Sequence, residues 1–128
     1  MPKPHSGTDL ELPVLQVIAD GKSHSISGVY IAIERTGILN DSDYSKVPTT
    51  AGYNSLKCLK IEVPKGVDAE RRLTDLVERH DLPYEFRYLN RVRYARRQLL
   101  KKGEIDSREH GSIAITEAGK SRLFRAQP

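Results

Sequence analysis

The stretch RYLNRVRYARRQLLKKGEIDSREHGSIAIT, residues 87–116, determines most of what the sequence implies about the fold. Its first part, up to Gly103, holds seven positive side chains and no acidic one, whereas the whole chain has a net charge of +4. The remaining residues together therefore carry −3. Charge clustered in one segment indicates a surface for an acidic partner more strongly than a high isoelectric point does.

The same part of the chain has the spacing of an amphipathic helix. At about 100° per residue, one apolar stripe is predicted to pack in a core, and it consists of Tyr88, Val92, Ala95 and Leu99. The opposite face carries Asn90, Tyr94, Arg97 and Lys101, flanked by Arg91, Arg93 and Gln98. Gly103 is predicted to end this helix because glycine readily adopts the conformation that follows a helix.

A β-hairpin and a short helix are predicted next. Ile105 precedes a polar tip at residues 107–111, and Ile113 and Ile115 alternate with small residues after it. This pattern is typical of two short strands joined by a turn. Thr116 is predicted to cap a final helix that runs to about residue 124.

Two helices are predicted near the start of the chain. The first has Thr8 or Asp9 as its N-cap and ends at Gly21. The second is capped by a serine, Ser25 or Ser27. Gly37 is predicted to stop it.

The remaining segments define the predicted domain boundaries. Residues 1–8 contain two prolines and a glycine, so we expect a disordered tail before one domain at residues 9–128. Residues 40–83 are predicted to form an insertion in that domain. Within it we expect a polar loop to about residue 53, then a strand in which Leu59, Ile61 and Val63 alternate with charged residues. A helix is expected next within residues 67–82, with Asp68 as its cap. Cys58 would lie buried and inert in that strand.

This order of elements predicts an α+β fold of the winged helix-turn-helix class, in which helices pack with a β-hairpin wing and which here carries a strand-and-helix insertion. In such folds the helix before the hairpin enters the major groove of duplex DNA. Double-stranded DNA is therefore the expected partner. The residues expected in the groove are Arg91, Arg93, Tyr94, Arg97 and Lys101, with Asn90 as a base-reading candidate and Arg108 and His110 as wing contacts.

A family resemblance points the same way. Three motifs carry it: Asn90-Arg91-Val92-Arg93-Tyr94-Ala95-Arg96, Leu100-Lys101-Lys102-Gly103-Glu104-Ile105 and Ile115-Thr116-Glu117-Ala118-Gly119. With them the chain resembles the N-terminal winged-helix domain of Mrr-like restriction system proteins. The resemblance implies a DNA-binding module joined to a separate nuclease domain. That domain is missing here, so the chain is expected to be a stand-alone relative or a fragment, with a nuclease domain or subunit as a possible partner.

Enzymatic chemistry is not expected. The Glu-x-Lys or Gln-x-Lys motif that metal-dependent restriction nucleases use to hold Mg²⁺ does not occur. One cysteine and four scattered histidines offer no paired spacing for a zinc site. We therefore expect no catalytic residue, no metal and no cofactor.

The expected function is sequence- or modification-directed binding of duplex DNA, by a restriction-associated reader or a transcriptional regulator. The alternative is a winged-helix module that binds proteins without touching DNA. No apolar run approaches the roughly 20 residues that span a membrane, and a lone thiol suits a cytoplasmic location. Because palindromic sites are usually read by dimers, a homodimer is expected, and the insertion could supply its surface.

Overall fold

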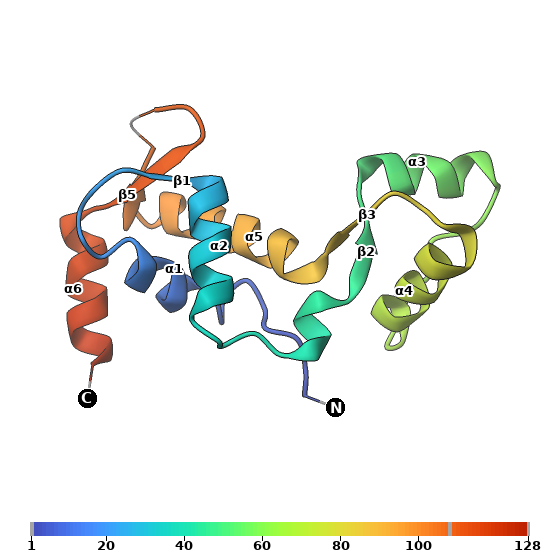
Figure 1. Ribbon diagram of the computed structural model, residues 1–128, viewed down its shortest axis with the longest axis horizontal. Helices are drawn as coiled ribbons and strands as arrows, with labels where there is room; N and C mark the ends of the chain where they lie inside the picture. The colour runs from blue at the N-terminus through green and yellow to red at the C-terminus, as the bar shows by residue number, and fades with distance from the viewer. Residues whose placement is uncertain (1, 108, 128) are drawn as a thin grey trace.

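The protein has an α+β fold, as predicted, in the computed structural model, which describes residues 2–107 and 109–127 (Figure 1). The elements, in chain order, are α1 (Glu11–Val17), β1 (His24–Ser25), α2 (Ile26–Arg35), the 3-10 helix η1 (Asp41–Tyr44), β2 (Lys46–Pro48), α3 (Thr50–Cys58), α4 (Ala69–His80), β3 (Tyr84–Phe86), α5 (Arg87–Lys101), β4 (Ile105–Asp106), β5 (Ser112–Ile115) and α6 (Glu117–Ala126).

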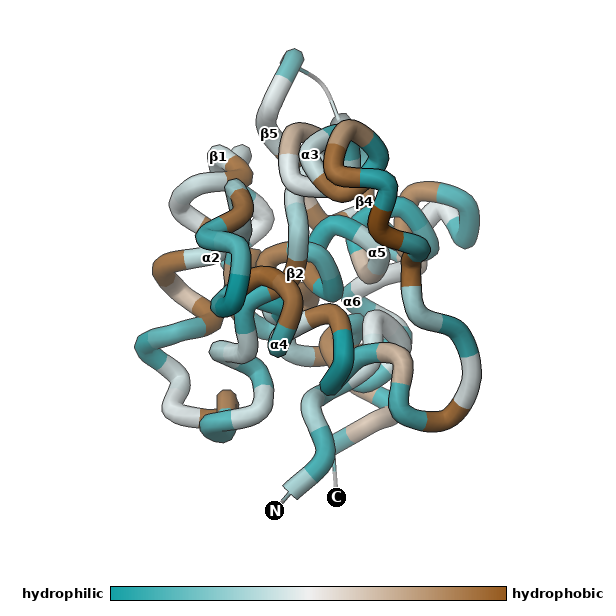
Figure 2. Tube along the Cα trace, turned by 90° about the vertical axis from the view of Figure 1, so that its right-hand side faces the viewer, coloured by the Kyte–Doolittle hydropathy of each residue, from teal (hydrophilic) through white to brown (hydrophobic). Residues whose placement is uncertain are grey.

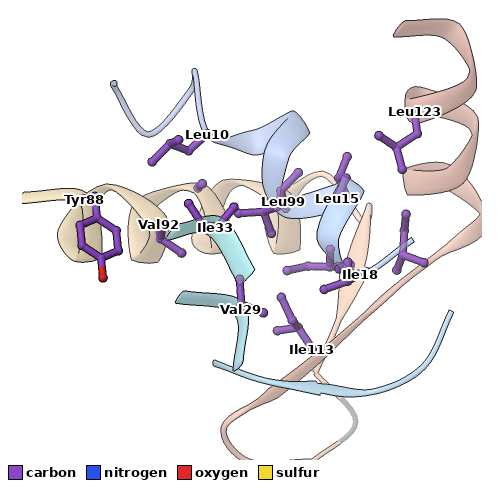
Figure 3. Close-up of a cluster of buried hydrophobic side chains, with 14 residues drawn as sticks. Leu10, Leu15, Ile18, Val29, Ile33, Tyr88, Val92, Leu99, Ile113 and Leu123 are labelled. Carbon is purple, nitrogen blue, oxygen red and sulfur yellow. The ribbon is translucent and has the colours of Figure 1, made fainter. Parts of the chain in front are cut away.

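One core joins α1, α2, α5, β5 and α6, and Figure 3 shows side chains from all of them pointing toward one another. The stripe predicted on α5 is buried in this core, because Val92, Ala95 and Leu99 are at most 2% exposed. Burial of apolar area at this scale supplies the main driving force for folding. The other buried members of the core include Leu10, Val14, Leu15, Ile18, Val29, Ile33, Ile113 and Leu123.

The predicted hairpin is present and belongs to a larger sheet. Strand β4 pairs antiparallel with β5, and Ile105 lies opposite Ile115. Strand β1 pairs with the other edge of β5, which gives the strand order β1-β5-β4. All four residues of β5 are therefore buried. Strand β1 was not predicted, because a strand of two residues is too short to show alternation.

Side-chain caps start two of the helices at the predicted residues. The Ser25 hydroxyl accepts a hydrogen bond from the Gly28 amide (3.0 Å) and starts α2. The Thr116 hydroxyl accepts one from the Gly119 amide (3.3 Å) and starts α6. The predicted stop residues Gly37 and Gly103 both have positive φ angles, of 76° and 71°, which glycine adopts without strain.

The predicted cap of the first helix was wrong. Helix α1 begins at Glu11 with Leu10 at the N-cap position, and it ends at Val17 rather than near Gly21. Asp9 instead accepts a hydrogen bond from the Ser6 amide (2.9 Å) in the turn before the helix. Because Asp9 forms a local turn with Ser6, neither predicted residue caps the helix, and Leu10 occupies the N-cap position without a side-chain cap.

The segment predicted as a disordered tail makes defined contacts. The His5 Nδ1 atom lies 2.7 Å from Oδ2 of the fully buried Asp43, and the His5 amide donates to the same carboxylate. The Asn40 side chain donates to the Lys3 carbonyl (2.9 Å). Residues 2–8 are thus held beside η1, which the proline and glycine content of the segment did not indicate.

Residues 46–86 build a second, smaller unit around α3 and α4, seen at the right of Figure 1. Strands β2 and β3 pair antiparallel at its base. Its own core consists of Leu56, Val77 and Leu82. The helix predicted within residues 67–82 is confirmed as α4, and Asp68 occupies its N-cap position, although the Asp68 side chain makes no capping hydrogen bond.

The loop predicted to about residue 53 and the strand predicted after it were wrong. Helix α3 occupies residues 50–58, capped by Thr49. Leu59 and Val63 are exposed, at 53% and 39%, and Cys58 is exposed rather than buried. The alternation did not reflect a strand. Leu56 is buried in the core of this unit with Val77 of α4, and Ile61, just past the end of α3, packs against the same core.

A group of ion pairs ties α1 to α5 and α6. Glu11 is 1% exposed, and its Oε1 atom accepts from Lys102 Nζ (2.7 Å) and from Arg122 Nη1 (2.8 Å). Arg122 also pairs with Glu104 (2.6 Å). Burial alone would raise the pKa of the Glu11 carboxyl, but the hydrogen bonds from both cations outweigh it and hold that pKa below its ordinary value.

We expect Glu11→Gln to lower the free energy of unfolding at neutral pH by about 1–3 kcal/mol, the scale of hydrogen bonds to charged groups. Because the folded-state pKa of Glu11 is lowered, its contribution is full above the unfolded pKa and is lost as the pH falls through the folded one. The difference in the free energy of unfolding between the unmodified protein and Glu11→Gln should therefore shrink as the pH falls into the acid range. Urea unfolding over a pH series measures it, with the exposed Glu62→Gln as control. A gap that stays constant from neutral to acid pH would contradict the assignment.

Candidate nucleic-acid interface

The polar face predicted on α5 is open to solvent. Asn90, Arg97 and Lys101 are all exposed, and their spacing places them on one side of the helix. Val92 and Leu99, which face the core, lie on the opposite side. Packing of the apolar stripe against α1 and α2 thus directs these three polar side chains outward.

Two arginines near the start of α5 are engaged by one acid of the inserted unit. Glu70, on α4, accepts from Arg91 Nη2 at 2.5 Å and lies 3.5 Å from Arg87 Nη1. Arg87 is buried (6% exposed), whereas Arg91 is partly exposed. Their positive charge is therefore partly neutralised inside the molecule.

Arg93 is held in the same way by an acid of β3. Its guanidinium makes two parallel contacts with the Glu85 carboxylate, one of them between Nη1 and Oε2 at 3.0 Å. The hydrogen bonds from Arg93 to Glu85 raise the pKa of the arginine. Paired contacts of this geometry also fix the orientation of the side chain. With Lys102 on Glu11, four of the seven cations of residues 87–103 are paired with acids.

Three cations of the segment have no acidic partner among the described residues: Arg96, Arg97 and Lys101. Arg96 is half-buried beside the core stripe, and its Nε atom is buried without a hydrogen-bond partner. Arg97 and Lys101 are exposed. The unneutralised charge of α5 is thus concentrated in its C-terminal half.

Tyr94 is fixed at the edge of this face. It remains 44% exposed, yet its ring lies directly over Gly7 of the N-terminal segment. A Cβ atom at position 7 would come within 2.0 Å of the ring, so only glycine fits there. The N-terminal segment therefore restrains this aromatic side chain.

The hairpin tip lies beyond the C-terminal end of α5. His110 is exposed in it, next to the exposed acid Glu109. The Gly111 carbonyl accepts from the Ile26 amide (3.0 Å), which ties the tip to the first turn of α2. Arg108, the other predicted wing contact, lies outside the described residues.

A pocket of about 190 Å³ separates the start of α5 from the inserted unit. Asn90 borders this pocket, and so do Tyr53 from α3 and Leu73 from α4. Asn90 thus lies where the exposed face of α5 meets the inserted unit, and its amide group can both donate and accept hydrogen bonds.

Sequence reasoning did not find Glu70 and Glu85, the acids that engage Arg87, Arg91 and Arg93. Glu85 precedes Arg93 by eight residues and Glu70 precedes Arg91 by 21. Neither spacing is one at which side chains meet on a helix. No pattern in the sequence could have revealed these pairs without the chain path through α4 and β3.

Among the described residues, no helix is long and apolar enough to cross a membrane. The same part of the chain has no group of three or more His, Cys, Asp or Glu side chains arranged to hold a metal ion. Comparison with protein-family models, curated proteins and solved structures found no match to this chain. Its function therefore has to be inferred from the geometry described above.

Because Arg93 is paired with an acid and Arg97 is not paired with one in the part of the chain that the structure describes, reversing the charge at these two positions of α5 should lower the free energy of unfolding by different amounts. Arg93→Glu should lower the free energy of unfolding by about 1–2 kcal/mol, because it removes two charged hydrogen bonds and faces Glu85 with a like charge. Arg97→Glu should change it by less than about 0.5 kcal/mol, as expected at an exposed position. Chemical unfolding of both variants measures this difference. Equal costs would show that the Arg93–Glu85 pair is not formed in solution.

Proposed function

We propose that this protein binds duplex DNA through a winged helix-turn-helix, with α5 as the reading helix and the β4–β5 hairpin as the wing. The order of α1, α2, α5 and the hairpin, and their shared core, support this assignment. An α-helix fits the major groove of B-form DNA, and a hairpin beside it can reach the flanking backbone.

The observation that carries the proposal is the face of α5 formed by Asn90, Arg97 and Lys101. It is exposed, it lies opposite the buried stripe, and its two cations have no acidic partner among the described residues. Cations of this kind neutralise phosphates and release the counterions condensed on DNA. Arg97 and Lys101 would supply affinity that does not depend on sequence.

Arg91 and Arg93 take a different role in this proposal from the one predicted from sequence. Glu70 and Glu85 already neutralise them, so contact with a phosphate would require breaking an internal ion pair. We assign to them the positioning of α5 against the inserted unit. In this proposal Asn90, Arg97 and Lys101 make the contacts in the major groove, and Tyr94 lies at the edge of the face that they form.

The salt dependence of binding tests this division. Affinity for duplex DNA should fall steeply as salt is added, and the double variant Arg97→Ala/Lys101→Ala should make the log–log slope shallower by about two units. Arg91→Ala, on the same helix, is the matched control and should leave the slope nearly unchanged because Glu70 already neutralises that charge. Fluorescence anisotropy over a salt series measures the slopes. A larger effect from Arg91 than from the double variant would refute the division.

Asn90 is the proposed base-reading residue, because its amide can bond to a base edge in the major groove. We expect Asn90→Ala to weaken binding to a preferred site by about 1–3 kcal/mol while sparing random duplexes. Selection from a random pool, with methylated and unmethylated bases, would first supply the preferred site. If Asn90→Ala weakens the binding of all duplexes to the same extent, Asn90 contacts the DNA backbone and does not read bases.

The alternative is a protein-binding module, and one observation favours it. Tyr44, Tyr84 and Phe86 form an exposed set of edge-to-face aromatic contacts near β3, with Lys46 over the Tyr84 ring. Exposed aromatics are enriched at protein interfaces. Absence of any duplex binding at low salt would support this alternative. The expected homodimer and the nuclease partner stay predictions in either case.

A further inference from the structure

Helix α3 and the β4–β5 hairpin lie on the same side of the molecule, at opposite ends of α5. Figure 1 shows both above α5, the hairpin at the left and α3 at the right. In the view turned by 90°, both again lie toward the top and α3 is above α4 (Figure 2). A partner that lies along α5 between them would therefore meet both elements.

The position of α3 relative to α5 is fixed by close backbone contacts. The Thr49 amide, at the start of α3, donates to the Pro83 carbonyl (3.2 Å) just before β3. A Cβ atom on Gly52 would lie only 2.3 Å from the same carbonyl oxygen, so the helix approaches this strand as closely as glycine allows. Strand β3 then runs directly into α5. The two helices are thus joined by a short, packed connection.

The exposed surface of α3 carries positive charge and no acid. Between Tyr44 and Ile61 the chain has no aspartate or glutamate. Thr50, Asn54 and Lys57 share a helix face opposite the buried Leu56, and all three are exposed, as is Lys60 just past the helix end. The acids of the unit lie after this stretch: Glu62 is exposed in the loop that follows Lys60, Glu85 lies in β3, and the others lie on and around α4, namely Asp68, Glu70, Asp75, Glu78 and Asp81.

We propose that α3 is a second DNA-contacting element, which binds the sugar-phosphate backbone beyond the N-terminal end of α5 through Asn54, Lys57 and Lys60. This inference rests on the proposed function and extends it. The charge of this face complements a phosphate backbone, and the C-terminal end of α3, where Lys57 and Lys60 lie, extends away from β3 and α5 (Figure 1). The inserted unit would then act as a counterpart of the hairpin wing at the other end of the reading helix.

The dimensions of the helix suit this arrangement. Helix α5 has 15 residues and is therefore about 22 Å long at 1.5 Å per residue. The wing and α3 lie beyond opposite ends of this helix (Figure 1). A duplex of about two helical turns is long enough to reach both.

The test uses the full chain and a duplex of about 20 base pairs, with the variant Lys57→Ala/Lys60→Asn. Lys60 has a φ angle of 59°, and asparagine tolerates this left-handed conformation. We expect a salt slope shallower by about two units and, at 0.1 M salt, affinity reduced by up to about eightfold per lost contact. The control Lys65→Ala/Arg79→Gln removes two exposed charges from the loop before α4 and from α4 itself. It should bind like the unmodified protein.

Cys58 provides a second readout that needs no substitution. It is the single cysteine of the chain and is exposed at the end of α3. Saturating duplex should slow its alkylation by a thiol reagent, and this measurement decides the case if the lysine variant fails to fold. If the lysine variant binds duplex DNA as tightly as the unmodified protein, or if duplex does not protect Cys58 from alkylation, the inference about α3 is overturned. The proposed function still stands in that case if Arg97→Ala/Lys101→Ala weakens binding. Absence of any duplex binding by the unmodified chain would overturn both.

Discussion

The buried stripe of α5 is the constraint on which the rest of the structure depends. Val92, Ala95 and Leu99 pack against α1 and α2, and a helix that buries one stripe must present the opposite one. Because the helix carries six cations on its other positions, the packing of this stripe determines which of them are exposed to solvent. The hairpin that follows Gly103 then completes the same core through Ile105, Ile113 and Ile115.

Internal ion pairs reduce the charge that the protein offers to a partner. Glu70 and Glu85 engage three arginines at the start of α5, and Glu11 engages Lys102 at its end. These pairs also hold the inserted unit and α1 against the helix. The cations of residues 87–103 therefore divide into two groups. Those at both ends of α5 form ion pairs that hold the fold together, and those between them remain at least partly exposed on the surface. A count of arginines alone would overestimate the number of cations left without an acidic partner in the described part of the protein.

Elements with strong local patterns could be predicted from the sequence, and those that depend on distant partners could not. The amphipathic spacing of α5, the serine and threonine caps and the glycine stops placed α2, α5 and α6 correctly. Strand β1 and helix α3 were missed because β1 has only two residues and α3 is stabilised by contacts of Leu56 with Val77 and Leu82. For the site, the exposure of Asn90, Arg97 and Lys101 followed from periodicity. The pairing of Arg91 and Arg93 depends on a chain path that no local pattern encodes.

The central claim is that the exposed face of α5 meets duplex DNA. Titration of the isotopically labelled protein with a duplex, followed by amide and side-chain NMR shifts, tests it residue by residue. We expect the largest shifts at Asn90, Arg97 and Lys101 and in the hairpin tip, with small ones on the acidic helix α4. Shifts confined to the aromatic surface of Tyr44, Tyr84 and Phe86, or no shifts at low salt, would contradict it.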